Sequence, residues 1–302
     1  MLDKYFLLNK IVNVLKKNQF NTFVTSGCFD IVAKREFLIL IKTLLNVDAL
    51  NSEQSSSLRA VSHFLSAYPF VISLRNNREF LNDETVYSRF ELPVITPKLF
   101  EEMIEEEEIY VAESSKGRHT TNIDSFSLRE KRKELGYTMQ ELAQKVGISK
   151  KALYEIENKR VNPTEETVEK LESLLGVRFK LPFEMKVAKE TYLKPENAFQ
   201  ETVSKEFSRM GIDNSSVHSA PFEIVGRERF SLITNLSKNT VKIKKEANIV
   251  RRLSSIFSSK AIFIAKRSHE KTVEGIPIFL ESQLSEIESS RELEGIISEN
   301  EY

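Results

Sequence analysis

Five polar side chains gather on one short stretch near the middle of the 302-residue chain. They fall away from the apolar stripe of Ala152, Leu153 and Ile156, and they are Lys150, Lys151, Glu155, Asn158 and Lys159. Lysine can donate to guanine O6 and N7 in the major groove, glutamate can accept from cytosine N4, and basic side chains neutralise phosphate. The stretch therefore has the chemistry to read duplex DNA. Two plainer interpretations stay open: a solvated helix face for the lysines, and pairing of Glu155 with Lys151 or Lys159 one turn away.

Short helices would position this stretch. The apolar spacing predicts helices over residues 127–135, 139–146 and 150–159, and a further helix from near residue 164 to residue 175. Thr138 and Glu141 form a capping-box pattern, and Ser149 is the expected cap of the third helix. The backbone N–H groups at these two helix starts could also bind phosphate. Gly147 in the turn and the small Ala143 at the crossing are typical of a helix-turn-helix.

The segment Leu128–Val177 resembles the phage Cro/repressor-like (XRE) helix-turn-helix family. The resemblance is carried by Gly136-Tyr-Thr-Met-Gln-Glu-Leu-Ala143, Val146-Gly-Ile-Ser149, Ile156-Glu-Asn158, Asn162-Pro163 and Leu174-Leu-Gly-Val177. It implies a five-helix domain whose third helix enters the major groove of double-stranded DNA. One such domain covers half a turn of DNA, so a homodimer is expected.

The resemblance also implies roles for single residues. Base edges would face Lys150, Lys151 and Glu155, and the phosphates would lie at or near Met139, Gln140, Tyr154, Asn158, Lys159 and Arg160. Arg132 and Glu157 would form a structural ion pair. Met139 departs from the family pattern, which often has Gln there, although Gln140 follows directly. Tyr154 could instead be an ordinary surface aromatic.

The two flanks of this segment resemble each other. Three matches occur in the same order, at offsets of 193, 192 and 184 residues: Gly27–Phe37 with Ala220–Phe230, Val61–Arg75 with Leu253–Arg267, and Leu92–Ile95 with Ile276–Phe279. Three matches in one order predict two copies of one α/β domain. Each copy is expected to run helix, two short strands, helix, buried strand, short strand and terminal helix, the last over residues 98–108 and 281–287.

Asp30, followed by a strand that ends in Leu40-Ile41-Lys42, resembles the restriction-endonuclease-like pattern. That chemistry needs two carboxylates for Mg²⁺ and a lysine that polarises phosphate or water. Here Leu40 stands at the second carboxylate position, and Glu36 lies four residues too early. The other copy has Glu223, Ile233 and Asn235 at the three positions. We therefore expect two non-catalytic, nuclease-like domains, each with one potential metal ligand that would hold Mg²⁺ weakly.

Charge is unevenly distributed although the total is zero. Residues 1–110 carry 12 basic and 15 acidic side chains, and residues 125–180 carry 12 and 9, so the basic excess lies in the middle. A single cysteine excludes a disulfide scaffold, and Cys28 is expected to be a small buried apolar residue rather than a reactive thiol. No apolar run approaches the roughly 18 residues that a membrane span needs, so we expect a cytoplasmic protein without membrane contact.

These observations predict an α+β multidomain chain. The expected boundaries are 1–112 for a nuclease-like α/β domain, 113–124 for a polar linker, 125–181 for the all-α helix-turn-helix domain, and 182–302 for the second nuclease-like domain. The whole resembles the archaeal family of helix-turn-helix transcriptional regulators. The leading hypothesis is a sequence-specific DNA-binding transcriptional regulator, without cofactor or metal and not an enzyme. The alternative is a Mg²⁺-dependent nuclease targeted by the helix-turn-helix.

Overall fold

The computed structural model describes residues 3–106, 108–115, 118–238 and 240–300. They fall into two compact units, one formed by Met1–Glu79 with Lys186–Tyr302 and the other by Phe80–Met185. Among the described residues, no helix has the combination of length and hydropathy that crossing a bilayer requires. The chain thus consists of mixed α/β units with a helical segment in the middle.

The first unit holds two similar runs of elements. The earlier run is α1 (Lys4–Lys17), β1 (Asn21–Val24), β2 (Ile31–Lys34), β3 (Leu38–Asn46), the 3-10 turn η1 (Val47–Ala49), α2 (Ser52–Phe64) and β4 (Tyr68–Arg75). The later run is α8 (Ala198–Arg209), β9 (Asp213–Ser216), β10 (Ile224–Arg227), β11 (Ser231–Ser237), α9 (Thr240–Phe257), β12 (Lys260–Ala265), β13 (Thr272–Val273), β14 (Ile276–Leu280), η2 (Glu281–Glu286) and α10 (Ser290–Asn300). The strand order β1-β2-β3-β4 is repeated as β9-β10-β11-β12.

Strand register supports the duplication of the flanks. Ile31 pairs with Ile41 in one hairpin and Ile224 with Thr234 in the other, so both partners shift by 193 residues. Further along, the pair of Ser88 with Pro93 recurs as Thr272 with Pro277, a shift of 184 residues. Because a slip of one residue would turn every side chain to the other face, a shared register shows that both copies bury the same positions.

Each copy in the first unit packs its helix against the strands of the other. Helix α2 contacts β9 and β10, and helix α9 contacts β1 and β2, which is the reciprocal pattern of a two-fold interface. Arg227 on β10 donates through Nε to the Phe64 carbonyl at 2.6 Å, and its counterpart Lys34 donates to the Ser258 hydroxyl at 2.6 Å. The Phe257 ring meets the edges or faces of Phe29 and Phe222 at centroid distances of 6.4 and 6.3 Å.

Gly27 permits the closest approach of the two copies. Its φ is +136°, and a β-carbon there would lie 2.0 Å from the Ser219 carbonyl oxygen. The neighbouring Cys28 amide donates to that same oxygen at 2.6 Å. Only glycine leaves room for this backbone contact, so a side chain at position 27 would push the copies apart.

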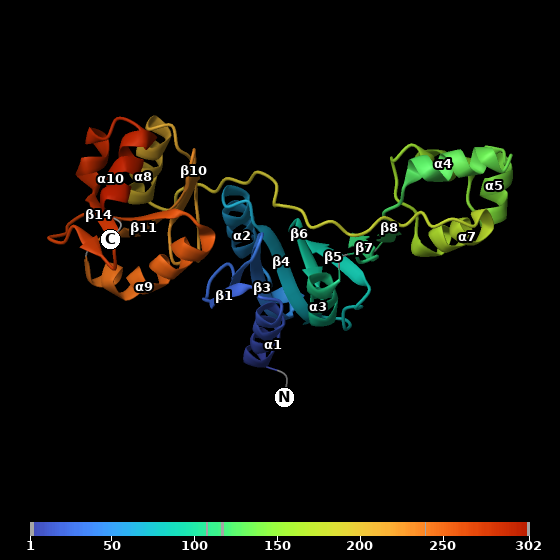
Figure 1. Cartoon of the computed structure of the whole chain (residues 1–302), viewed down its shortest axis with the longest axis horizontal. Helices are drawn as coiled ribbons and strands as arrows, with labels where there is room; N and C mark the ends of the chain where they lie inside the picture. The colour runs from blue at the N-terminus through green and yellow to red at the C-terminus, as the bar shows by residue number, and fades with distance from the viewer. Residues whose placement is uncertain (1–2, 107, 116–117, 239, 301–302) are drawn as a thin grey trace. The chain divides into compact units, whose positions relative to one another are not determined.

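The second unit joins a small sheet to the helical segment. Its elements are β5 (Thr85–Arg89), β6 (Leu92–Ile95), α3 (Pro97–Glu105), β7 (Ala112–Ser115), β8 (Arg118–Thr121), α4 (Ser125–Glu134), α5 (Met139–Val146), α6 (Lys150–Glu157) and α7 (Glu165–Leu175), with strand order β6-β5-β7-β8. Figure 1 shows α4, α5 and α7 in green and yellow-green as one helical group. Their buried side chains meet in one core with Leu153 and Ile156 of α6.

A buried ion pair fastens α4 to α6. Arg132 donates to both carboxylate oxygens of Glu157, Nε to Oε1 at 2.6 Å and Nη2 to Oε2 at 2.9 Å. Its third donor reaches the Tyr137 carbonyl at 3.0 Å, just before α5. The side chains are 10% and 1% exposed. The hydrogen bond that Arg132 donates to Glu157 holds the pKa of the guanidinium above its usual range. Through these three donors one side chain ties together three consecutive elements.

Several expectations need correction. The stretch 113–124, predicted to be a linker, contains β8 and most of β7, because its polar residues pair β7 with β5 and β8 with β7. The boundary expected at residue 112 therefore falls inside a sheet and does not match either unit. The predicted terminal helix 281–287 is the 3-10 helix η2, and a true helix, α10, follows it. The edge strands β1 and β9 were not predicted.

The helical segment also differs from the five-helix domain that the resemblance implied. Described residues 125–185 contain four helices. After Gly176 the chain is extended, Lys180 bridges to Ile123, and the Phe179 amide donates to Glu172 Oε1 at 2.7 Å. Phe179 is 1% exposed and packs in the core formed by the four helices.

We predict that Arg227→Met lowers the free energy of unfolding of the first unit by about 2 kcal/mol, because it leaves the Phe64 carbonyl without its buried donor. Hydrogen exchange on α2 measured by mass spectrometry would report the loss. Arg229→Ala is the matched control, since its side chain is 69% exposed and pairs with its neighbour Glu228. Equal exchange in both variants would contradict the role of Arg227.

We predict that Arg132→Ala lowers the melting temperature by stranding the buried Glu157 carboxylate, at a cost of about 3–5 kcal/mol. Hydrogen exchange over residues 125–180 would localise the effect. The double variant Arg132→Met with Glu157→Leu should recover most of the stability, because it removes both charges. An unchanged melt in the single variant would show that the pair contributes nothing.

Candidate nucleic-acid interface

Helix α6 carries the candidate interface: one of its faces packs in the core, which leaves the opposite face exposed to solvent. Leu153 and Ile156 are 0% and 4% exposed, and Glu157 is held by Arg132 on the same side. Ser149 caps the helix by accepting from the Ala152 amide at 3.0 Å. The opposite face is exposed over its length and displays Lys150, Lys151, Tyr154, Asn158, Lys159 and Arg160.

The two lysines of the first turn distinguish this face, because they place positive charge at the start of the helix. Lys150 and Lys151 are exposed, and within the part of the chain that the structure describes neither ammonium group has an ion-pair partner. A cation at a helix N-terminus opposes the macrodipole, at a cost of about 0.3–1 kcal/mol. Helix α6 also has no acidic residue in its first turn to offset them. The start of α6 is thus a locally unfavourable concentration of positive charge that an external anion would relieve.

Further along α6, the predicted contacts interact with one another. Glu155 Oε1 lies 3.4 Å from Arg160 Nη1, and the Arg160 guanidinium lies 5.6 Å from the centre of the Tyr154 ring. Neither predicted alternative for Glu155, Lys151 or Lys159, is its partner. Arg160 is 60% exposed on its side chain, so this weak, screened contact can open at little cost.

The remaining predicted residues lie around α5 and the end of α6. Thr138 and Glu141 form the capping box, with Glu141 Oε2 accepting from the Thr138 amide at 2.8 Å. Gln140 is exposed, whereas Met139 is half-buried against the core. The Asn158 amide nitrogen donates to the Tyr154 carbonyl at 2.7 Å and so caps its own helix. Lys159 has a φ of +57°, which ends the helix and turns the chain outward.

Asp30 in the first copy is held by four donors. Its Oδ2 accepts from the Thr43 amide at 2.8 Å and the Thr43 hydroxyl at 3.1 Å, and its Oδ1 lies 3.3 Å from Lys42 Nζ and 2.9 Å from Lys4 Nζ. Both oxygens are therefore occupied. Leu40 is fully buried, and Glu36 is exposed in the turn at the other end of the hairpin. Mg²⁺ needs several free oxygens around it, and these residues do not fit it.

The second copy repeats this arrangement with different residues. Glu223 Oε2 accepts from the Leu236 amide at 2.7 Å, as Asp30 does from Thr43 one offset earlier. Its Oε1 pairs with Lys242 at 2.9 Å. Asn235 replaces Lys42, donating to the Pro221 carbonyl at 2.9 Å and to Glu246 at 2.7 Å. Burial raises the pKa of Glu223. Each copy thus holds one carboxylate by a backbone amide and a lysine.

One other group of polar side chains was not predicted from the sequence. Ligand atoms of Glu53, Glu196 and His218 lie within 4.8 Å of one another, but both glutamates are exposed and water can satisfy them, so the group alone assigns no metal. Because these residues come from three distant segments, no local pattern could indicate them. Cys28 is fully buried, which raises the pKa of its thiol to about 12 and leaves it unreactive.

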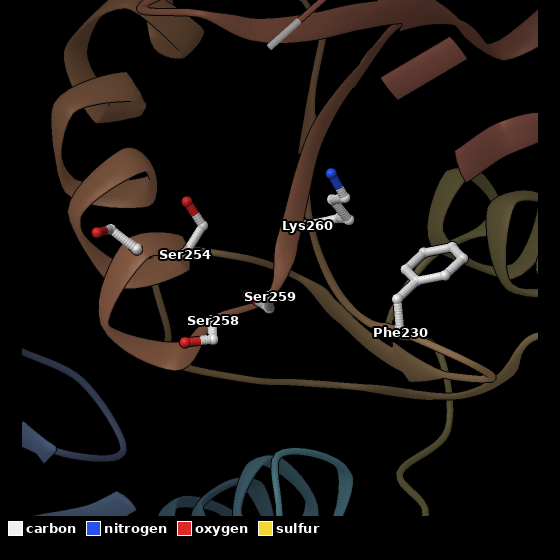
Figure 2. Close-up of a pocket in the computed structure, with 6 residues that line it drawn as sticks. Phe230, Ser254, Ser258, Ser259 and Lys260 are labelled. Atoms are coloured by element: carbon white, nitrogen blue, oxygen red, sulfur yellow. The ribbon is translucent and has the colours of Figure 1, made fainter. Parts of the chain in front are cut away.

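A polar pocket of about 360 Å³ lies at the end of α9. Figure 2 shows Ser254 and Ser258 on the helix side and Lys260 at the start of β12. The equivalent place in the first copy is filled by Phe37 and Tyr68, whose rings meet edge to face at 5.7 Å. The pocket therefore reflects the replacement of one aromatic ring, that of Tyr68, by Lys260, and its lining contains no acid or imidazole.

Known families match this chain in two places. The PD-(D/E)XK superfamily domain matches residues 4–109, and a helix-turn-helix domain matches residues 128–181. Among solved structures, the DNA complex of SinR, the master regulator for biofilm formation, is 38% identical over 18% of this chain and 90% of that chain, with a TM-score of 0.17.

Full-length relatives occur in archaea. A protein of Methanothermobacter thermautotrophicus named "Putative HTH-type transcriptional regulatory protein" is 30% identical over 99% of this chain and 97% of its own length. A protein of Pyrococcus horikoshii with the same description is 28% identical over 100% of this chain and 99% of its own. The chain therefore belongs to the family of archaeal HTH-type transcriptional regulatory proteins, which combines a helix-turn-helix with a PD-(D/E)XK superfamily domain.

Proposed function

We propose that the chain is a sequence-specific DNA-binding transcriptional regulator that reads duplex DNA with α6. The observation that supports this most is the unpaired charge of Lys150 and Lys151 in the first turn of that helix. A structural role would favour acids there. Lysines at this place are instead suited to donate to guanine O6 and N7 in the major groove.

The neighbouring residues would complete binding in two ways. Lys159 and Arg160 would neutralise phosphate, together with Asn158, Gln140 and the amides at the Thr138 and Ser149 helix starts. When Arg160 moves to a phosphate, Glu155 is released from its 3.4 Å contact and could accept from cytosine N4. Met139 would contribute packing rather than a hydrogen bond, since it is half-buried and its thioether is a weak acceptor.

We further propose that the nuclease-like copies are not catalytic. In both copies the carboxylate is already engaged by a lysine and a backbone amide. They would act as a scaffold, and binding to two half-sites would be by a homodimer. DNA binding would place the chain in the cytoplasm of an archaeal cell.

We predict that Lys150→Ala with Lys151→Ala abolishes sequence-specific binding without unfolding the protein. Each guanine contact that is lost should cost about 1–3 kcal/mol. Fluorescence anisotropy on a duplex selected from random-sequence DNA would measure this, with circular dichroism as the folding check.

The control for that experiment is Lys131→Ala with Lys133→Ala on α4. It removes the same charge from the same domain, but these lysines pair with Glu134 and Glu130. We expect the control to keep sequence-specific binding, and its affinity for DNA to depend less steeply on salt concentration. Specific footprints retained by the α6 variant would refute the assignment.

We predict no cleavage of plasmid or branched DNA by the full chain in Mg²⁺ or Mn²⁺, because neither copy offers a free pair of carboxylates. Gel analysis after long incubation would test this. Cleavage that disappears in Asp30→Ala or Lys42→Ala would establish the nuclease alternative.

A further inference from the structure

An open groove of about 440 Å³ lies in the first unit, where α9 of the second copy crosses β1 of the first. Its lining includes Asn21 and Phe23 on β1 and Asn248, Arg251 and Arg252 on α9. Among the described strands, β1 is the outermost and has β2 as its only strand neighbour. The groove thus borders a sheet edge that can accept a further extended chain.

The reciprocal packing of the two copies provides a counterpart for this groove. Its equivalent lies between β9 and α2, since α2 contacts β9 as α9 contacts β1. There the groove is covered by an extended segment of the chain itself, residues 186–197, which we call the strap. The Leu193 amide donates to the Ser215 hydroxyl on β9 at 2.9 Å, and the Tyr192 ring meets Phe64 of α2 edge to face at 5.7 Å.

The strap covers one groove and leaves the other open, and the exposure of equivalent side chains on β9 and β1 differs accordingly. Ser216 on β9, which pairs with Ile224, is 1% exposed, whereas its counterpart Val24 on β1, which pairs with Ile31, is 42% exposed. The Tyr192 hydroxyl in the strap also donates a hydrogen bond to Asp213 Oδ2 on β9, at 2.8 Å. In the described residues no segment plays this part over β1. The first copy therefore leaves uncovered a face that its counterpart buries beneath an extended peptide.

Charge indicates what kind of peptide would fit. The lining of the open groove contains Arg251 and Arg252 and no acidic residue. Arg252 lies 5.7 Å from the centre of the Phe23 ring, so positive charge and an aromatic surface are adjacent. Arg251 contacts Glu274 at 3.3 Å, but both side chains are largely exposed, so the contact is readily exchanged.

We propose that this groove binds an extended acidic segment of a partner protein. The segment would lie along β1, as the strap lies along β9, with an aromatic or aliphatic side chain over Phe23. One or more carboxylates would face Arg251 and Arg252. This is strand-edge recognition, in which the backbone follows the sheet and side-chain contacts select the sequence. The site is separate from the DNA-reading helix and would let a partner act on the regulator.

The probe for this proposal is a fluorescent peptide with the strap sequence in which Lys186, Lys189 and Lys194 are replaced by glutamate. Anisotropy with the full chain should show saturable binding, tighter than for the unchanged strap sequence. Arg251→Glu with Arg252→Glu should weaken binding about tenfold or more by placing like charges opposite the peptide. Arg267→Glu, an exposed site outside the groove, should leave binding unchanged.

The proposal is overturned by the absence of saturable binding, or by binding that the arginine variants do not weaken. It also fails if sedimentation shows a dimer of the full chain that separates in the double arginine variant, since a second copy would then be the occupant. Displacement of the peptide by a short random duplex in the Lys150→Ala/Lys151→Ala background would assign the groove to DNA. None of these readouts needs specific DNA binding, so the proposal can fail independently of the proposed function.

Discussion

The orientation of the exposed face of α6 depends on one buried charge pair. Arg132 on α4 donates hydrogen bonds to both carboxylate oxygens of Glu157 on α6 and to the Tyr137 carbonyl, which lies just before α5. Such a pair adds little net stability over apolar packing, but breaking it is costly, so it favours one arrangement of the helices over alternatives. With α6 fixed in this way, its apolar side meets the core and its lysines face outward. The positive first turn is a consequence of that orientation.

The two copies hold a carboxylate in the same frame with different residues. The carboxylates of Asp30 and Glu223 occupy equivalent places and accept equivalent backbone amides. Lysine ammonium groups contact these carboxylates: those of Lys4 and Lys42 contact Asp30, and that of Lys242 contacts Glu223. Ammonium groups of the chain itself thus balance the charge of these carboxylates. What the duplication preserves is the pairing of the two copies, through α2, α9 and the Gly27 contact.

Sequence reasoning succeeded where the signal was local. Glycine stops, caps and apolar spacing located α4 to α7 closely, and repeated motifs predicted the duplicated flanks. It failed where tertiary contacts decide: the polar residues of β7 and β8 became strands because β5 offered a partner, and the chain after Gly176 is extended, with Phe179 in the core, instead of forming a further helix. For the predicted DNA contacts of Lys150 and Lys151 the structure adds only that both side chains are exposed. The contact between Glu155 and Arg160 could not be predicted from the sequence and is seen only in the structure. The groove beside β1 combines residues more than 220 positions apart, which no local pattern joins.

Photo-crosslinking tests the central claim most directly. The full chain would be irradiated with a selected duplex carrying photoreactive bases, and the attached peptides would be identified by mass spectrometry. If α6 enters the major groove, crosslinks should concentrate in residues 149–160, with the strongest at the start of the helix. Crosslinks confined to the nuclease-like copies, with residues 149–160 unmodified, would contradict the account, because the duplex would then lie against a different surface.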